Sequence, residues 1–470
     1  MSKRFQLTPE QIALSEERKA KKQKLQAQAQ VLPSDKTEER LLARPWLNLN
    51  NTTPANGIRV KLMTWNLLAQ CLVRRELFPT SGNVLKGAQR QPMLHAEILR
   101  HGADIMCLQE VDSLDKILPA LEAAQYNHHF VAGPGKKHGC LVAFKRTYEK
   151  IDERLIHYDE LHVRSEGDEN TRRGSSFRTR NIGSIVALKD LSNDGEGVVI
   201  GTTHLFWHPK YTYERTRQAG ILVREMVKFR SDLQLENWPC MIAGDFNFSP
   251  DDPGYSLLVG DQLNAEQRDR LETSRVVHLS IDPTVPPTVK GAPAEDEGGA
   301  VDPDRVITSA RRAVPADGLL SDSELASLFS AANVVRSAYD EGLRQYKEAS
   351  STGFPTFGDR MSLPRTKKGY YEPEYTSYTH YWKVCSAFLP QRHLLTSLSK
   401  TVLDYIFILT DRPAVVDGLL SLPLVKDLVP GLPQKGICGS DHLSLCAEII
   451  LPPISPIAES EARTTESTDK

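Results

Sequence analysis

Short apolar runs of the kind that form β-strands recur along the chain from about residue 59 onward, and this rhythm constrains the fold more than any other feature. Between several of them lie helical patterns, such as Pro92–His101 and Thr212–Leu233, the second with apolar residues near three- and four-residue spacing. Strands interleaved with helices in this way indicate an α/β architecture. The expected strands are Val60–Trp65, Asp104–Leu108, Cys140–Phe144, Gly183–Leu188, Val198–Thr203, Pro239–Ala243, Val402–Leu409 and Leu443–Leu451.

Most of these runs end on, or contain, a polar residue that packing alone does not explain. A buried carboxylate in an apolar strand is costly unless it is paired or bound to a metal. One such residue alone is more often a cap or a turn residue, but strand ends in α/β sheets can converge on one crevice. Together these residues predict an active site, and they are Asn66, Glu110, His204, Asp245, Asn247, Asp404, Asp441 and His442.

The oxygen ligands in this set suit a hard cation. Glu110 supplies a carboxylate of the kind that magnesium prefers, and Asn66 and Asp441 are of a type that adds direct or water-mediated contacts. Soft ligands are missing from the set, so zinc and copper are disfavoured. We therefore expect Mg²⁺ as the cofactor, with Mn²⁺ as the alternative.

The other polar residues fit the steps of a hydrolysis at phosphorus. Asp245 with Asn247 is suited to orienting and deprotonating an attacking water. His204 and His442 can donate to a phosphoryl oxygen as negative charge builds there. Asp404 is suited to holding His442 charged and oriented, by the logic of an Asp–His pair in a hydrolase triad.

Composition excludes several classes of protein. The formal net charge is −2, so any nucleic-acid surface must be local. The 7 cysteines show no CxxC spacing, which favours reduced thiols over a disulfide scaffold or a zinc site. No run approaches the roughly 18–20 apolar residues of a membrane span, and the N-terminus lacks the apolar stretch of a secretory signal. We expect no membrane partner and a location in the cytoplasm, the nucleus or both.

The regular pattern does not cover the whole chain. Residues 1–45 are rich in Lys, Gln and Glu and are expected to form a solvated helix or disordered tail. Residues 46–455 are expected to form one catalytic domain, interrupted at about 261–317 by an irregular insert rich in Pro, Gly, Ala and charge. A helical pattern follows at Ser321–Glu341, and residues 456–470 form a polar tail.

The polar strand ends belong to short motifs, and the order of these motifs resembles that of the exonuclease–endonuclease–phosphatase family. The resemblance implies a four-layered α/β sandwich with two mixed β-sheets and an active site at one edge. It also implies the roles already considered: Glu110 holding magnesium with Asn66 and Asp441 nearby, Asp245 and Asn247 activating water, and His204 and His442 contacting the phosphate. The motifs are Thr64-Trp-Asn66, Leu108-Gln-Glu110, Thr203-His-Leu205, Gly244-Asp-Phe-Asn247, Leu403-Asp-Tyr405 and Ser440-Asp-His-Leu443.

Further motifs narrow the resemblance to one branch. Thr203-His-Leu-Phe-Trp-His-Pro209, Arg217-Gln218, Ser337-Ala-Tyr339 and Glu372-Pro-Glu-Tyr-Thr376 resemble the nocturnin, Angel and carbon-catabolite-repression deadenylase branch. The Lys-rich start and the long insert look most like fungal Ngl-type RNA exonucleases. Only about 55 mostly polar residues precede the first expected strand, so docking to a deadenylase complex through leucine-rich repeats is not expected.

Several residues outside the strand ends are candidates for contact with single-stranded RNA. Arg178 and Arg180 precede an expected strand and can bind phosphate, although a solvated loop would look the same. Lys136 and Lys137 precede another strand in the same manner. Trp207 can stack on an unpaired base.

Three more candidates come from the family resemblance. Asn181 matches a position near the substrate, although a turn-capping asparagine would look identical. In deadenylases of this branch, Pro209 and an aromatic residue after the Tyr-Thr motif help to hold an adenine. That second position falls near His380, which leaves adenine selection open.

Two functional classes remain open at this level. One is a 3′→5′ exoribonuclease that trims ribosomal-RNA precursors or poly(A) tails. The other is a phosphatase acting on nucleotide cofactors or on RNA cyclic phosphates. A catalytically inactive binding protein is disfavoured because Glu110, Asp245 and His442 are all present. Protein partners are not indicated.

Overall fold

A computed structural model of the chain describes residues 41–49, 58–192, 196–288, 307–332, 335–350, 353–383, 395–410 and 413–451. Within these residues, β2 and β3 are parallel and lie near the centre of a large sheet whose other neighbours are antiparallel. The strand order is β1 (Trp46–Asn48), β16 (Val415–Leu420), β17 (Leu445–Leu451), β2 (Ile58–Asn66), β3 (Ile105–Val111), β5 (Gly139–Lys145) and β4 (Tyr126–Ala132).

The second large sheet repeats this design. Its parallel pair is β8 and β9, and the other neighbouring strands are antiparallel. The order is β12 (Val335–Ser337), β15 (Asp404–Leu409), β9 (Cys240–Asp245), β8 (Gly197–His204), β7 (Ile182–Asp190) and β6 (Tyr148–His157). The prediction of two mixed sheets is confirmed.

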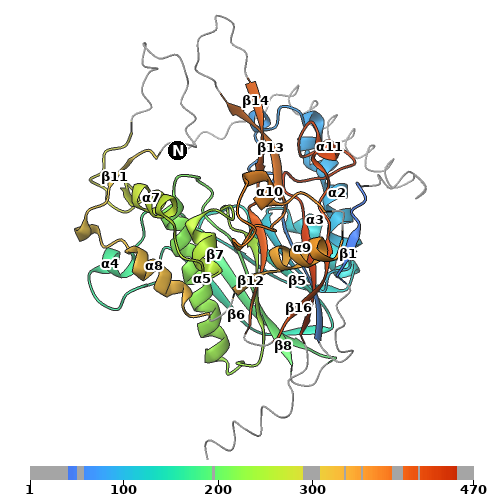
Figure 1. Cartoon of the computed structure of the whole chain (residues 1–470), viewed down its shortest axis with the longest axis horizontal. Helices are drawn as coiled ribbons and strands as arrows, with labels where there is room; N and C mark the ends of the chain where they lie inside the picture. Colours follow the sequence, from blue (N-terminus) through green and yellow to red (C-terminus); the bar gives the residue numbers. More distant parts are fainter. Residues whose placement is uncertain are drawn as a thin grey trace, which may run out of the picture. The chain divides into compact units, whose positions relative to one another are not determined.

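Helices cover the outer face of each sheet and complete the four layers. In Figure 1, α5, α7 and α8 lie on one side of the sheets, and α2 and α3 lie on the other. The bounds are α2 (Gly87–Arg100), α3 (Leu114–Ala123), α5 (Thr212–Asp232), α6 (Pro253–Leu258), α7 (Ala265–Thr273), α8 (Asp322–Phe329) and α9 (Ala338–Ala349). Shorter elements are α4 (Glu169–Arg173), α10 (Phe357–Met361), α11 (Val425–Leu428) and the hairpins β10 (Val276–His278)–β11 (Ala310–Arg312) and β13 (Ser377–Lys383)–β14 (Leu395–Thr401).

Three apolar clusters hold the layers together. The middle one joins the two sheets, for example Leu62 and Val142 with Val198 and Ile406. The other two lie between each sheet and its helices. Because the central strands are covered on both faces, they read as nearly continuous apolar runs, and every residue of β9 is buried.

Two segments differ from the sequence-based expectation. The stretch predicted to be irregular at about 261–317 contains α7, which starts with a capping box between Asn264 and Gln267, and both strands of the β10–β11 hairpin. Residues 289–306 of this stretch lie outside the described residues. The helix expected at Ser321–Glu341 is instead α8, then strand β12, then α9. Short polar elements such as α7 carry little apolar periodicity, so composition concealed them.

The packed chain extends further toward the N-terminus than the predicted boundary at residue 46. Leu41 is buried, and Arg44 forms an ion pair with Glu97 of α2 at 3.0 Å, with both side chains almost fully buried. Residues 1–40 and 452–470 lie outside the described part of the chain. No helix in the described part is both long enough and apolar enough to cross a bilayer.

Candidate active site

The parallel strand pair in each sheet delivers polar side chains to one place. Asn66 ends β2, and Glu110 lies near the end of the parallel strand β3. In the other sheet, His204 ends β8 directly beside Asp245, which ends β9. Because parallel strands end at the same edge of a sheet, and because the two sheets pack face to face, these four side chains meet.

Antiparallel neighbours add two more residues of the predicted set from the opposite strand direction. Asp404 begins β15 in register with Asp245 at the end of β9. His442 lies just before β17, which starts opposite the end of β2. A strand that starts beside the end of its antiparallel neighbour places its first residues at the same edge, so Asp404 and His442 join the site.

Glu110 is turned toward the site by an irregularity in β3. The pairing of β3 with β5 shifts register between Leu108 and Val111, and Glu110 adopts a φ of 56°. A bulge of this kind re-aims a side chain. The Glu110 carboxylate accepts hydrogen bonds from Asn66 Nδ2 at 3.0 Å and from the backbone N–H of Ala69 at 2.8 Å.

Asp245 lies at the centre of the site and is 1% exposed. Its Oδ2 accepts a hydrogen bond from Asn66 Nδ2 at 2.9 Å, and its Oδ1 accepts one from the backbone N–H of Asn247 at 3.0 Å. The Nε2 atoms of His204 and His442 lie 3.6 and 3.8 Å from Asp245 Oδ2. Asn66 therefore links the carboxylates of Glu110 and Asp245.

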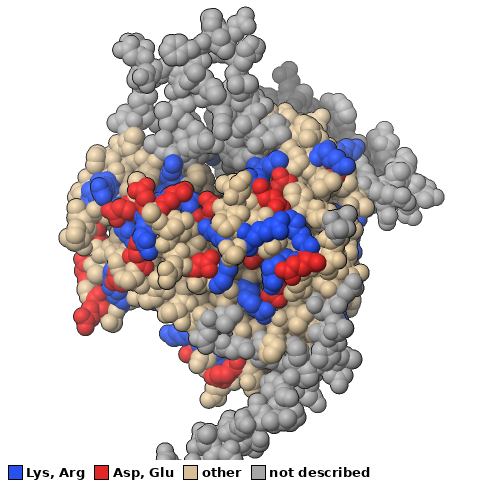
Figure 2. All heavy atoms as spheres, in the orientation of Figure 1, with Lys and Arg blue, Asp and Glu red and all other residues tan. Residues whose placement is uncertain are grey.

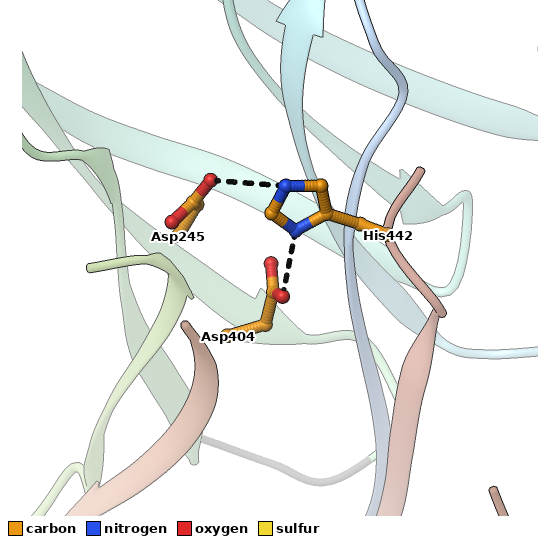
Figure 3. Close-up of side chains that lie close together, drawn as sticks. All are labelled: Asp245, Asp404 and His442. Carbon is orange, nitrogen blue, oxygen red and sulfur yellow. Dashed lines mark hydrogen bonds and ion pairs between the residues drawn. The ribbon is translucent and has the colours of Figure 1, made fainter. Parts of the chain in front are cut away.

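His442 and Asp404 form a buried imidazole–carboxylate pair (Figure 3). His442 Nδ1 lies 2.8 Å from Asp404 Oδ2, and Thr376 Oγ1 donates to the same oxygen at 2.6 Å. Burial opposes a charge on His442, but the nearby carboxylates of Asp404 and Asp245 outweigh it and hold the pKa of the imidazole well above its usual value. The geometry keeps a protonated His442 with Nε2 directed toward Asp245.

The chemistry of the donor set suits a divalent cation. Among the described residues, no lysine or arginine forms an ion pair with Glu110, Asp245 or Asp441. Asp441 is half-buried next to His442, and burial raises the pKa of its carboxyl group. Carboxylates gathered in one place without a lysine or arginine partner are the environment that a hard cation neutralises.

A second group of potential ligands is formed by Asp245, Asp404 and His442, whose donor atoms all lie within 4.8 Å of one another. The close contact between His442 Nδ1 and Asp404 already engages two of these residues. His442 and Asp404 are therefore already a charge pair, although Asp404 Oδ1 is buried without a hydrogen-bond partner among the described residues. The oxygens of Glu110, by contrast, have only neutral donors as hydrogen-bond partners.

The candidate RNA contacts fall into two groups. Asn181 is buried beside the site: its Nδ2 donates to the carbonyl of His204 at 2.6 Å, and its Oδ1 accepts from Lys136 Nζ at 3.0 Å. Arg178 and Arg180 are exposed, and within the described residues their guanidinium groups have no hydrogen-bond or ion-pair partner. Asn181 is therefore part of the site's framework, while the two arginines are free to bind an anion.

The structure describes the side chains of two of the three candidates for contact with a base. Trp207 is 51% exposed, so its indole face is available to a base. Pro209 is also exposed, and its carbonyl accepts from Arg215 Nη2 at 3.0 Å. His380 belongs to β13, but its side chain lies outside what the structure describes.

Sequence reasoning missed two residues that shape the site. Thr376 contacts Asp404, and it belongs to the Glu372–Thr376 motif, which predicted a family branch but no role in the site. Asp159 accepts the backbone N–H groups of Thr179 and Arg180 at 3.2 and 2.7 Å. No signal in its polar surroundings distinguishes Asp159 from an ordinary loop acid.

The fold and the site together define a phosphoester hydrolase of a recognisable type. The chain belongs to the endonuclease/exonuclease/phosphatase family, whose sequence pattern matches residues 63–442. It is 35% identical over 290 residues to the RNA exonuclease NGL2 of Saccharomyces cerevisiae, a match that covers 56% of this chain and 55% of NGL2. It is 29% identical over 479 residues to the probable RNA exonuclease C9B6.11c of Schizosaccharomyces pombe, covering 94% of this chain and 88% of that protein.

A solved structure supports the same fold. The crystal structure of ANGEL2, described as a 2′,3′-cyclic phosphatase, superimposes with a TM-score of 0.55 at 20% sequence identity. The superposition covers 88% of this chain and 100% of that chain. The predicted family and its four-layered fold are therefore confirmed.

Proposed function

We propose that this protein is a magnesium-dependent 3′→5′ exoribonuclease that hydrolyses phosphodiester bonds at the end of single-stranded RNA. The observation that carries the proposal is the convergence of Glu110, Asp245 and the His442–Asp404 pair at one edge of the two sheets. The names of its relatives, RNA exonuclease and probable RNA exonuclease, favour RNA as the substrate. The trimming of ribosomal-RNA 3′ ends and the shortening of poly(A) tails are the two roles we propose for it.

Glu110 would hold the cation, with Asn66 and Asp441 beside it. When bound, Mg²⁺ or Mn²⁺ supplies Lewis acidity at a phosphoryl oxygen and neutralises developing charge. Asn66 directs its Nδ2 at both Glu110 and Asp245, and its Oδ1 accepts the backbone N–H of Leu68 at 2.9 Å. Asn66 therefore fixes the distance between the metal-holding carboxylate and the acid that we assign to the water.

Asp245 would accept the proton of the attacking water. Its two oxygens are fixed by Asn66 and by the backbone N–H of Asn247, so the carboxylate has one orientation. The Asn247 side chain donates through Nδ2 to the carbonyl of Leu205 at 3.0 Å, which leaves its Oδ1 to accept from the same water. An oriented acceptor of this kind lowers the entropic part of the barrier.

His442 and His204 would stabilise charge on the phosphate. Asp404 keeps His442 protonated, so Nε2–H is available to a phosphoryl oxygen as negative charge increases. His204 also lies beside Asp245, with Nε2 3.6 Å from Oδ2. Both imidazoles thus lie close to the carboxylate that we assign to the water.

RNA would be held outside this centre by local contacts only. On the face in Figure 2, Lys and Arg are interspersed with Asp and Glu, in keeping with the net charge of −2. Arg178 and Arg180 are free cations near the site, and Trp207 offers a stacking surface. Binding should therefore depend on a short stretch of RNA rather than on a long basic surface.

The proposal is tested by comparing 5′-labelled RNAs with A-tails and with mixed-sequence tails of equal length. Stepwise shortening of both tails in Mg²⁺, abolished by a chelator, is the expected result for a general 3′-end exonuclease. Shortening confined to the A-tail would identify a deadenylase. Release of phosphate from phosphorylated dinucleotides or cyclic-phosphate ends, with no shortening of either tail, would contradict the proposal.

A further inference from the structure

The loop Gly174–Asn181, called here the arginine loop, carries Arg178 and Arg180 and ends on Asn181 beside His204. Its inner side is fixed by the domain itself. Gln218 of α5 donates through Nε2 to Thr179 Oγ1 at 2.9 Å, and its Oε1 accepts the backbone N–H of Phe206 at 3.1 Å. Gln218 of α5 therefore joins the arginine loop to the segment just after His204.

The outer side of the arginine loop is held by the β10–β11 hairpin. The backbone N–H of His278 donates to the carbonyl of Ser176 at 3.1 Å. The backbone N–H of Arg178 donates to Ser280 Oγ at 3.0 Å. Between these bonds, the rings of Phe177 and His278 stack with their centroids 4.0 Å apart. Three consecutive residues of the loop thus contact the hairpin and the residues just after β10.

The neighbours of the Ser280 hydroxyl allow one assignment of its donor and acceptor roles. Its hydroxyl accepts from Arg178 and lies 2.9 Å from His278 Nδ1, to which the Ser280 backbone N–H also donates at 3.0 Å. Burial lowers the pKa of His278, which favours the neutral ring with an acceptor at Nδ1. The hydroxyl therefore donates to His278 while it accepts from Arg178, and both functions are used.

Arg178 is held through its backbone and not through its side chain. Its guanidinium has no partner among the described residues, and the hydrogen bond from its own backbone N–H to Ser280 helps to determine where the side chain starts. A guanidinium positioned from a fixed backbone loses less entropy on binding a phosphate than one on a free loop. The neighbouring Arg180 is fixed separately, through its N–H to Asp159.

We propose that the β10–β11 hairpin is a positioning element for the substrate, and that Ser280 and His278 hold Arg178 where it contacts the RNA backbone. The segment that composition marks as an irregular insert thereby takes part in RNA binding through His278 and Ser280. This inference rests on the proposed function, because it takes RNA as the ligand of Arg178.

The experiment compares Ser280→Ala with Thr284→Ala. Thr284 lies in the same segment, and its hydroxyl bonds only to Asp282 among the described residues, so it is a matched control. Ser280→Ala should raise KM for a short RNA about three- to tenfold, the range expected for one neutral hydrogen bond, with kcat within about twofold of wild type. Affinity for the same RNA, measured by fluorescence anisotropy in chelator, should fall by a similar factor.

Limited trypsin digestion gives a readout that does not need catalysis. Cleavage after Arg178 and Arg180 should be faster in Ser280→Ala than in wild type or Thr284→Ala, because the loop loses one of its outer bonds. Equal KM, RNA affinity and cleavage rate in the two variants would overturn the inference. Wild-type protein that binds RNA but releases no nucleotides would contradict the proposed activity, and the affinity and digestion arms would still decide the role of the hairpin.

Discussion

Four non-glycine residues around the site have positive φ angles: Leu68, Glu110, Arg180 and Asn247, with values of 57°, 56°, 58° and 52°. Each such residue costs on the order of 1–2 kcal/mol. Three of their backbone N–H groups are bound by side-chain oxygens of Asn66, Asp159 and Asp245. Polar side chains at the site thus stabilise the strained backbone that presents other polar side chains.

Glu110→Ala and Asp245→Ala should each lower kcat by at least about 100-fold, because one would remove the ligand that we assign to the cation and the other the acceptor that we assign to the water. The exposed acid Asp115 in α3 provides a control, and Asp115→Ala should leave the rate unchanged. The measurement is nucleotide release under saturating RNA, with circular dichroism to verify the fold. A rate near that of wild type in either variant would exclude the assigned role.

The His442–Asp404 pair predicts a specific pH dependence. Asp404 raises the pKa of His442, so the imidazolium persists to higher pH than in an isolated histidine. In Asp404→Asn this contribution is lost and the pKa of His442 falls, so the decline of kcat/KM at alkaline pH should begin at a lower pH than in wild type. The measurement is kcat/KM from pH 5.5 to 9. An alkaline limb at the same pH in both proteins would contradict the charged pair.

At the scale of elements, the arginine loop offers an internal comparison. Arg178 and Arg180 are unpaired, whereas Arg173 in α4 forms an ion pair with Glu169 at 2.6 Å. Arg178→Ala and Arg180→Ala should raise KM and reduce the slope of log affinity against log salt by roughly one each. Arg173→Ala, the matched control, should change neither. Equal salt slopes in all three variants would remove the loop from the RNA contacts.

The strands that position the site could be predicted because both their faces are buried. β2, β3, β8 and β9 read as apolar runs that end on a polar residue, so both the strand and its chemistry are visible in the sequence. β6 was missed because it is an edge strand with mostly exposed polar side chains. Its pattern does not differ from that of a loop.

The site was predicted only as far as its chemistry is local in sequence. The motifs indicated the strand-end residues, but Thr376 and Asp159 act through tertiary contacts with Asp404 and Arg180, which no spacing reveals. The β10–β11 hairpin was hidden for a different reason. Its strands are three residues each and lie more than thirty positions apart, so neither periodicity nor a turn signature marks them.

At the scale of the whole molecule, a buried acid should make stability depend on pH. Glu372 is fully buried between α6 and α9, its Oε1 accepts from Tyr255 at 2.9 Å, and its Oε2 has no hydrogen-bond partner among the described residues. Burial, with a contribution from Asp340, raises the pKa of Glu372 to about 8. The folded protein therefore keeps a proton that the unfolded chain releases above about pH 4.3.

The raised pKa of Glu372 sets the direction in which the free energy of unfolding changes with pH. A raised pKa gives stability that is fully present below the unfolded pKa and is lost progressively as the pH rises toward about 8. Glu372→Gln removes the titration, so its free energy of unfolding relative to wild type should increase by at least about 1 kcal/mol between pH 5 and pH 8. Urea denaturation at the two pH values measures it. A constant difference between the two proteins would show that Glu372 is not protonated in the fold.

A time course on one RNA would decide whether the strand ends of the two mixed sheets form a metal-dependent centre that shortens RNA from its 3′ end. The RNA carries a 5′ label, and wild type is compared with Glu110→Ala in Mg²⁺ and in chelator. We expect a ladder of stepwise shortened, labelled products for wild type in Mg²⁺ and intact RNA in the other reactions. Shortening that continues in chelator or in Glu110→Ala, or a label released first as a mononucleotide, would contradict the proposed function.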